Sequence, residues 1–160
     1  MISYIMAMTI AAQVRRPVSR LFQEIETRQG ERPWGRMLDA ATRTHSIGRI
    51  GTLPSEQWAA VTGADAHAVQ VRDAIARHRR EGDRIIVGNW ADSTLLAGES
   101  YDTVLADYLL GAIYGFAPYF QHRLFARLRP RVRRRLYVVG LEPYVVGEPD
   151  SEAGRLVWEI

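Results

Sequence analysis

The sequence contains no cysteine and no lysine among its 160 residues. Without cysteine the chain can form neither a disulfide nor a thiolate metal site, which fits the reducing cytoplasm, where we expect the protein to act. All 21 basic residues are arginines, and against 18 acidic residues they leave a formal net charge of only +3. So small an excess is a weak basis for binding nucleic acid. The four histidines are scattered without metal-ligand spacing, and no metal site is expected.

Long apolar runs are also missing, since a membrane-spanning helix needs roughly 20 apolar residues in succession. The apolar stretch at residues 1–12 is shorter than this, and Arg15 and Arg16 follow it, whereas a secretory signal has its positive charge first. We therefore expect no membrane partner. What is present is typical of a globular chain: 47% hydrophobic and 24% charged residues, over a length of about one domain.

The first part of the chain has a helical pattern. Between residues 9 and 28 apolar side chains recur at three- and four-residue spacing, which predicts an amphipathic helix. Glycine and proline within 30–35 end this pattern. We accordingly expect an N-terminal helical extension over 1–34 and a single α/β domain over 35–160.

The second part alternates short apolar runs with helical stretches. Five runs are short enough for buried strands and far enough apart for crossover helices: 35–39, 58–65, 84–88, 101–107 and 135–140. Helical spacing is clearest at 66–80 and 118–128. This order predicts a Rossmann-like, doubly wound, mostly parallel sheet of about five strands with helices on both faces.

Polar side chains follow the ends of four of these runs. They are Asp39, Asp65, Asn89 with Asp92, and Asp107. In a doubly wound sheet a ligand lies beyond the carboxyl ends of the strands, so these groups are expected to share one edge. Carboxylates and amides at that edge suit a ligand with ribose hydroxyls and an adenine ring.

In order and spacing these segments resemble the class I S-adenosylmethionine-dependent methyltransferase family. Residues 37–45 look like its first motif, 61–65 like the end of its second strand, 87–92 like its third motif, 101–107 like its fourth, and 124–136 like its fifth region. The resemblance covers the chain from about residue 35 to residue 144. It implies the Rossmann-like methyltransferase fold and S-adenosylmethionine as cofactor.

The resemblance also implies residue roles. Cofactor-binding positions would be Asp39 and Ala41 in the first motif, Asp65 at the ribose hydroxyls, and Asn89, Trp90 and Asp92 around the adenine. The residues alone leave alternatives open: each of the two leading aspartates could instead cap a helix N-terminus. The tryptophan could instead be an ordinary buried aromatic.

Asp107 and Tyr108 close the fourth run, where the methyl acceptor would lie. Methyl transfer from a sulfonium is an in-line displacement that depends chiefly on alignment, and a base is needed only if the acceptor must lose a proton. These two residues are therefore the catalytic candidates. Orientation of the acceptor, or of the cofactor's amine, is the alternative role for the carboxylate.

Two features depart from the family pattern. Ala41, Arg43 and His45 stand where the family has glycines, and we expect the last two side chains to crowd the space for the methionine part and the ribose. The family also has two further strands after the fifth, whereas residues 154–160 read as the opening turns of a helix. An edge left open in this way would favour a second copy or another partner that covers it.

Three functional hypotheses follow. The first is a methyltransferase that acts on a small-molecule acceptor. The second is a non-catalytic relative that no longer binds the cofactor and acts through a partner. The third is an RNA-modifying methyltransferase that uses the six arginines between Arg127 and Arg135, although such a cluster more often forms a solvated turn.

Overall fold

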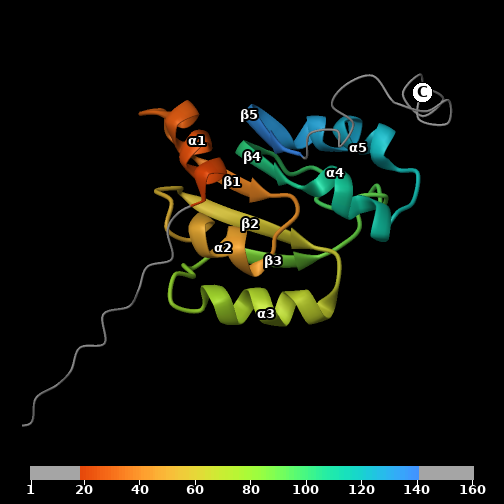
Figure 1. Ribbon diagram of the computed structural model, residues 1–160, viewed down its shortest axis with the longest axis horizontal. Helices are drawn as coiled ribbons and strands as arrows, with labels where there is room; N and C mark the ends of the chain where they lie inside the picture. Colours follow the sequence, from red (N-terminus) through yellow and green to blue (C-terminus); the bar gives the residue numbers. More distant parts are fainter. Residues whose placement is uncertain (1–18, 141–160) are drawn as a thin grey trace, which may run out of the picture.

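The protein is described by a computed structural model, in which residues 19–140 form a five-stranded sheet with helices around it (Figure 1). The strand order is β3-β2-β1-β4-β5, and each neighbouring pair is parallel. The strands are β1 Arg36–Asp39, β2 Gln57–Thr62, β3 Arg84–Val87, β4 Tyr101–Asp107 and β5 Val132–Val139. The predicted Rossmann-like parallel sheet is therefore confirmed.

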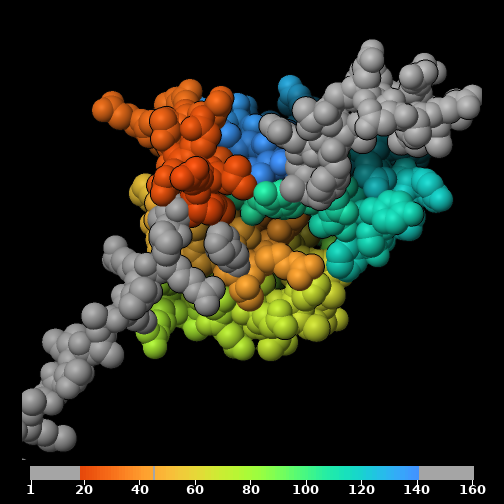
Figure 2. Space-filling view, viewed as in Figure 1, coloured from red at the N-terminus to blue at the C-terminus, as the bar shows by residue number. Residues whose placement is uncertain are grey.

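Helices pack on both faces of the sheet, because successive strand residues point to opposite sides. One face carries α1 Arg20–Gln29, α2 Thr44–Ile50 and α3 Asp65–Ile75, and its core includes Met37 and Trp58. The other carries α4 Leu109–Ala112, the short 3-10 helix η1 Ile113–Gly115 and α5 Gln121–Leu128, with Leu38 and Val104 in its core. Figure 2 shows α1 and α3 at the two ends of the first face, red and yellow-green.

Element bounds differ from the sequence-based expectation at several places. The strand expected over 58–65 ends at Thr62, and the one expected over 135–140 begins at Val132, directly after the 3-10 helix η2 Arg129–Arg131. No helix connects β3 to β4. The connection is a series of turns over 88–100, and its Leu95 and Leu96 are buried in the core that a helix would otherwise cover.

Both chain ends lie outside the described residues. The expected helix over 9–28 is therefore seen only as α1, whose Phe22 and Ile25 are buried with Met37. The helical turns expected at 154–160 fall outside the description altogether. Within residues 19–140, no helix combines the length and apolar character needed to cross a membrane.

Candidate functional site

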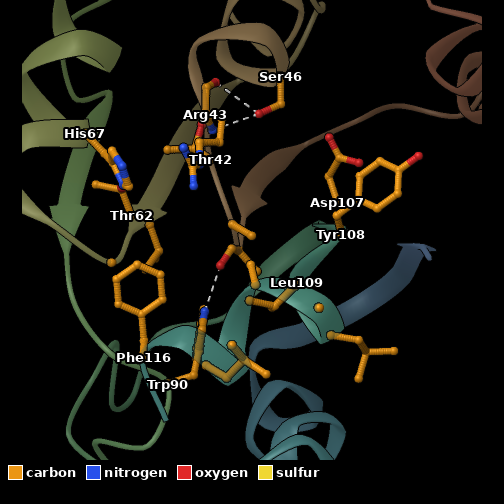
Figure 3. Close-up of a pocket in the computed structure, with 18 of the residues that line it drawn as sticks. Thr42, Arg43, Ser46, Thr62, His67, Trp90, Asp107, Tyr108, Leu109 and Phe116 are labelled. Carbon is orange, nitrogen blue, oxygen red and sulfur yellow. Dashed lines mark hydrogen bonds between the residues drawn. The ribbon is translucent and has the colours of Figure 1, made fainter. Parts of the chain in front are cut away.

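A cavity of about 780 Å³ opens at the carboxyl ends of the strands (Figure 3). Its walls come from residues 40–43 after β1, 61–63 at the end of β2, 88–90 after β3, and 107–113 after β4. The strand order reverses between β1 and β4, because chain order runs outward from β1 in one direction and from β4 in the other. Ligands of doubly wound sheets bind at such a reversal, so the cavity lies where the topology predicts a site.

The loop after β1 is held by bonds to both neighbouring strands. The amide of Ala40 donates to Leu105 of β4 at 2.8 Å, and the amide of Thr42 donates to Val61 of β2 at 2.8 Å. Next along the loop, the amide of Arg43 donates to Ser46 Oγ at 3.1 Å, a bond drawn in Figure 3. The loop backbone is therefore fixed by the protein itself.

This loop does not need the glycines that the family has. No residue from 40 to 45 has a positive φ; Arg43, for example, has φ −132° and ψ 170°, an extended conformation open to any residue. Glycine is required only where φ is positive or a Cβ would collide. The conformation of this loop therefore does not itself require glycine, whereas the space that a cofactor needs beside it stays a prediction.

Asp39 lies behind the loop, not on the cavity wall. Its carboxyl is fully buried, and Oδ1 accepts a hydrogen bond from the amide of Ala41 at 3.3 Å. Burial raises the pKa of Asp39 from 3.8 to about 7, although the nearby Thr42 hydroxyl and the hydrogen bond from the Ala41 amide work against that rise. The geometry shows Asp39 supporting Ala41, which does line the cavity.

Trp90 joins the loop after β3 to the loop after β1. Its indole Nε1 donates to the carbonyl oxygen of Ala40 at 2.7 Å, and the ring is 2% exposed (Figure 3). The ring belongs to the hydrophobic core and also forms part of the cavity wall. It thus combines a structural role with a position where an aromatic base could contact it.

The two polar neighbours of Trp90 are placed differently. Asn89 lines the cavity, with its Nδ2 donating to the carbonyl of Phe116 at 2.7 Å. Asp92 is exposed and off the cavity wall; its Oδ1 accepts from the amide of Thr94 at 2.8 Å, and this bond lowers its pKa. The structure brings Asn89, but not Asp92, to the cavity.

After β2, the predicted site residue Asp65 does not reach the cavity, and two neighbouring residues line it instead. Asp65 is the exposed first residue of α3 and does not line the cavity, whereas Gly63 and His67 do. The Phe116 ring packs so closely that a Cβ on Gly63 would lie 2.6 Å from it. Sequence inspection missed both lining residues. Their only signal was position: one directly follows β2, and the other is in the first turn of α3.

Asp107 and Tyr108 both border the cavity at the end of β4. Tyr108 has φ 51° and ψ 20°, a left-handed conformation, and its ring is 41% exposed. Figure 3 places these two side chains on one side of the cavity and His67 with Phe116 on the other. The pair proposed for catalysis therefore shares one wall.

Comparisons with solved structures identify the arrangement. A coclaurine N-methyltransferase bound to N-methylheliamine and SAH matches with a TM-score of 0.55 and 14% identity, over 74% of this chain and 34% of that one. The glycopeptide N-methyltransferase MtfA, complexed with SAH, matches with a TM-score of 0.57 and 18% identity, over 72% of this chain and 49% of that one. An S-adenosylmethionine-dependent methyltransferase from Clostridium acetobutylicum matches with a TM-score of 0.54 and 12% identity, over 71% of this chain and 44% of that one. This chain has the class I methyltransferase fold.

The likeness is one of fold, because the identities are low and the chain spans less than half the length of each of these structures. No protein-family model matches the sequence, and no curated protein matches it. In a class I methyltransferase fold the cavity between β1 and β4 is the position where a cofactor is to be sought.

The arginine cluster of this methyltransferase fold does not form one free cationic patch. Arg131 is 8% exposed and donates to the carbonyl of Leu95 at 3.1 Å. Arg134 pairs with Asp102 at 3.4 Å, and Arg133 donates to Ser100 Oγ at 2.8 Å. Half of the six arginines are therefore engaged within the protein.

Proposed function

We propose that the protein is an S-adenosylmethionine-dependent methyltransferase that acts on a small-molecule acceptor. One observation carries the proposal: the cavity of about 780 Å³ at the strand-order reversal of a class I methyltransferase fold. Small-molecule sites typically occupy about 300–1,000 Å³ and are lined by apolar groups with a few polar ones. Here Leu109, Leu110 and Ile113 are among the apolar groups, and Asn89 and Asp107 are among the polar ones.

The residues present fit a nucleoside cofactor in three ways. Ala41 and Arg43, which stand where the family has glycine, line the cavity without closing it, and no residue of the loop carrying them has a positive φ. Trp90, which is 2% exposed, and Asn89 line the cavity after β3, where the adenine is expected. Asp107 lines the same cavity after β4. These placements support binding of S-adenosylmethionine rather than the non-catalytic alternative.

Bound S-adenosylmethionine would supply an electrophilic methyl group on its sulfonium. The protein's own part would be alignment of the acceptor and exclusion of water. Leu109, Leu110 and Ile113 provide an apolar wall next to the reacting position. Asp107 can accept a proton from an acceptor amine or hydroxyl, or hold it by a hydrogen bond, and Tyr108 stands at the cavity mouth.

The test is calorimetric titration of the full 160-residue chain with S-adenosylmethionine and with S-adenosylhomocysteine. We expect saturable heat from both, together with slower amide hydrogen exchange at Gly63, Leu110 and neighbouring cavity residues but not in α1. An absence of heat at millimolar ligand would support the non-catalytic alternative. Heat without protection at the cavity would place the ligand elsewhere and contradict the proposed site.

Catalysis needs its own measurement. Once binding is established, transfer of a labelled methyl group to a panel of small amines, hydroxyl compounds and short RNAs would identify the acceptor class. Asp107→Asn should lower transfer while leaving cofactor binding within about twofold, if the carboxylate acts on the acceptor. Equal loss of cofactor binding would instead assign Asp107 to the cofactor. Transfer to RNA that weakens steeply with salt would favour the RNA-modifying alternative.

A further inference from the structure

Arg43 brings a permanent positive charge to the cavity. The ionisable side chains on the cavity wall are Arg43, His67, Asp107 and Tyr108, and only the guanidinium is charged at every accessible pH. In Figure 3 its side chain extends from the backbone held by Ser46 toward the side where His67 lies. Within residues 19–140, the Arg43 side chain makes no hydrogen bond and no ion pair, so none of these residues occupies its donors.

The backbone of the same loop offers no such donors. The amides of Ala40, Ala41, Thr42 and Arg43 are all used within the protein, by Leu105, Asp39, Val61 and Ser46 respectively. An acidic group of a ligand that approaches residues 40–43 therefore finds their backbone amides occupied, and the guanidinium of Arg43 is the charged donor at this point. Guanidinium and carboxylate form paired, charge-assisted hydrogen bonds with good geometry.

The surroundings favour an anion at this point. Among the cavity-lining residues near the loop, Thr42 and Ser46 are polar but uncharged, and the carboxyl of Asp39 is behind the wall with a pKa of about 7. The carboxyl group on the wall, that of Asp107, lies on another side of the cavity in Figure 3. Among residues 19–140, no acidic side chain pairs with the guanidinium at this part of the cavity.

From this arrangement we infer that Arg43 binds the carboxylate of the cofactor's methionine part, and that the cavity thereby selects nucleosides with an acidic tail. The inference rests on the proposed function. It reverses the expectation from sequence, in which an arginine in place of glycine only obstructs the cofactor. A phosphate would satisfy the same donor chemistry, so the test must separate the two acids.

The experiment titrates the full chain with three adenosine compounds. S-Adenosylhomocysteine carries the carboxylate, 5′-methylthioadenosine lacks the amino-acid tail, and adenosine monophosphate carries a phosphate. The variants are Arg43→Met, which keeps much of the side-chain length, and Arg43→Gly, which restores the family residue. Arg72→Met on the exposed surface of α3, off the cavity wall, is the control for lost charge.

We expect the wild type to bind S-adenosylhomocysteine about tenfold or more tightly than 5′-methylthioadenosine. Both Arg43 variants should lose this preference, with affinity for 5′-methylthioadenosine unchanged, and Arg72→Met should keep it. Tighter binding of S-adenosylhomocysteine by Arg43→Gly would show that the side chain obstructs, and would overturn the inference alone. So would variants that keep the wild-type preference. Failure of the wild type to bind any of the three would overturn the proposed function as well, and preference for the phosphate would assign a different ligand class.

Discussion

The loop after β1 and the turn after β4 both border the cavity, and backbone strain is distributed between them in an unexpected way. The first contains Ala41 and Arg43 where related motifs have glycine, yet no residue from 40 to 45 has a positive φ. The second contains Tyr108, a bulky residue, at φ 51°. The loop that lacks glycine is therefore unstrained, and the left-handed conformation lies in the turn after β4 instead.

The contrast teaches that a missing glycine is informative only together with the backbone conformation it would have served. In the loop after β1, hydrogen bonds to Leu105 and Val61 hold an extended course that alanine, threonine and arginine all tolerate. The unfavourable contribution in that loop is electrostatic instead. The carboxyl of Asp39 accepts the amide bond of Ala41 but is fully buried, and burial disfavours its ionised form. Each of the following predictions tests one side of this comparison.

The largest effect is expected at Asp39. Its pKa is raised from 3.8 to about 7 in the folded protein, so ionisation is penalised there and not in the unfolded chain. The penalty is absent below about pH 4, grows between pH 4 and 7, and is complete above that range. Asp39→Asn should therefore exceed the wild type in unfolding free energy by roughly 2–4 kcal/mol at pH 8.5 and match it near pH 4.

Urea unfolding at both pH values measures the Asp39 difference directly. The asparagine keeps an oxygen that can accept the Ala41 amide bond, so the comparison isolates the charge. A stability difference that stays constant between pH 4 and pH 8.5 would contradict an electrostatic origin. The stability difference would then come from the packing around residue 39.

The next largest effect concerns the bond between Trp90 and the carbonyl of Ala40. Trp90→Phe removes the donor and leaves that carbonyl buried without it, which should cost about 1–3 kcal/mol of unfolding free energy. Trp58→Phe is the matched control, because Trp58 is equally buried but its Nε1 has no partner within the described residues. Thermal or urea unfolding should show the larger loss for Trp90→Phe. Equal losses would mean that ring volume, not the hydrogen bond, dominates.

At Tyr108 the prediction compares two truncations that remove the same ring. Glycine adopts the left-handed conformation without cost, whereas alanine retains a Cβ that is disfavoured there by about 1–2 kcal/mol. Tyr108→Gly should therefore be more stable than Tyr108→Ala by about 1 kcal/mol, measured by urea unfolding. If the alanine variant is the more stable, the left-handed turn is not retained in solution.

The sequence was informative where burial alone determines structure. β4 was predicted with its observed bounds, because Tyr101–Asp107 is a continuous run buried between two neighbouring strands. The parallel order followed from alternating strands and helices. The end of β2 was predicted too late, because the strand was extended through Gly63 and Ala64 to Asp65, whereas pairing with β3 stops at Thr62.

The sequence predicted at which edge of the sheet the site lies, but not which side chains line its cavity. Asn89, Trp90, Asp107 and Tyr108 reach the cavity as strand order requires, whereas Asp65 turns into the exposed start of α3. Which side chain faces the cavity depends on the turn between a strand and its helix, and a shift of two residues there replaces one side chain by another. Their roles toward a ligand remain predictions.

The smallest expected effect is at Ala41, and it has the opposite sign from Tyr108. Ala41 lies in a loop with negative φ throughout, so Ala41→Gly gains no conformational relief and adds freedom to the unfolded chain. The variant should lose about 0.4–1 kcal/mol of unfolding free energy. Measured beside Tyr108→Gly and Tyr108→Ala, it asks whether glycine stabilises the turn after β4 while destabilising the loop after β1. A gain in stability from Ala41→Gly would show that this loop does need the glycine it lacks, and would remove the contrast between the two.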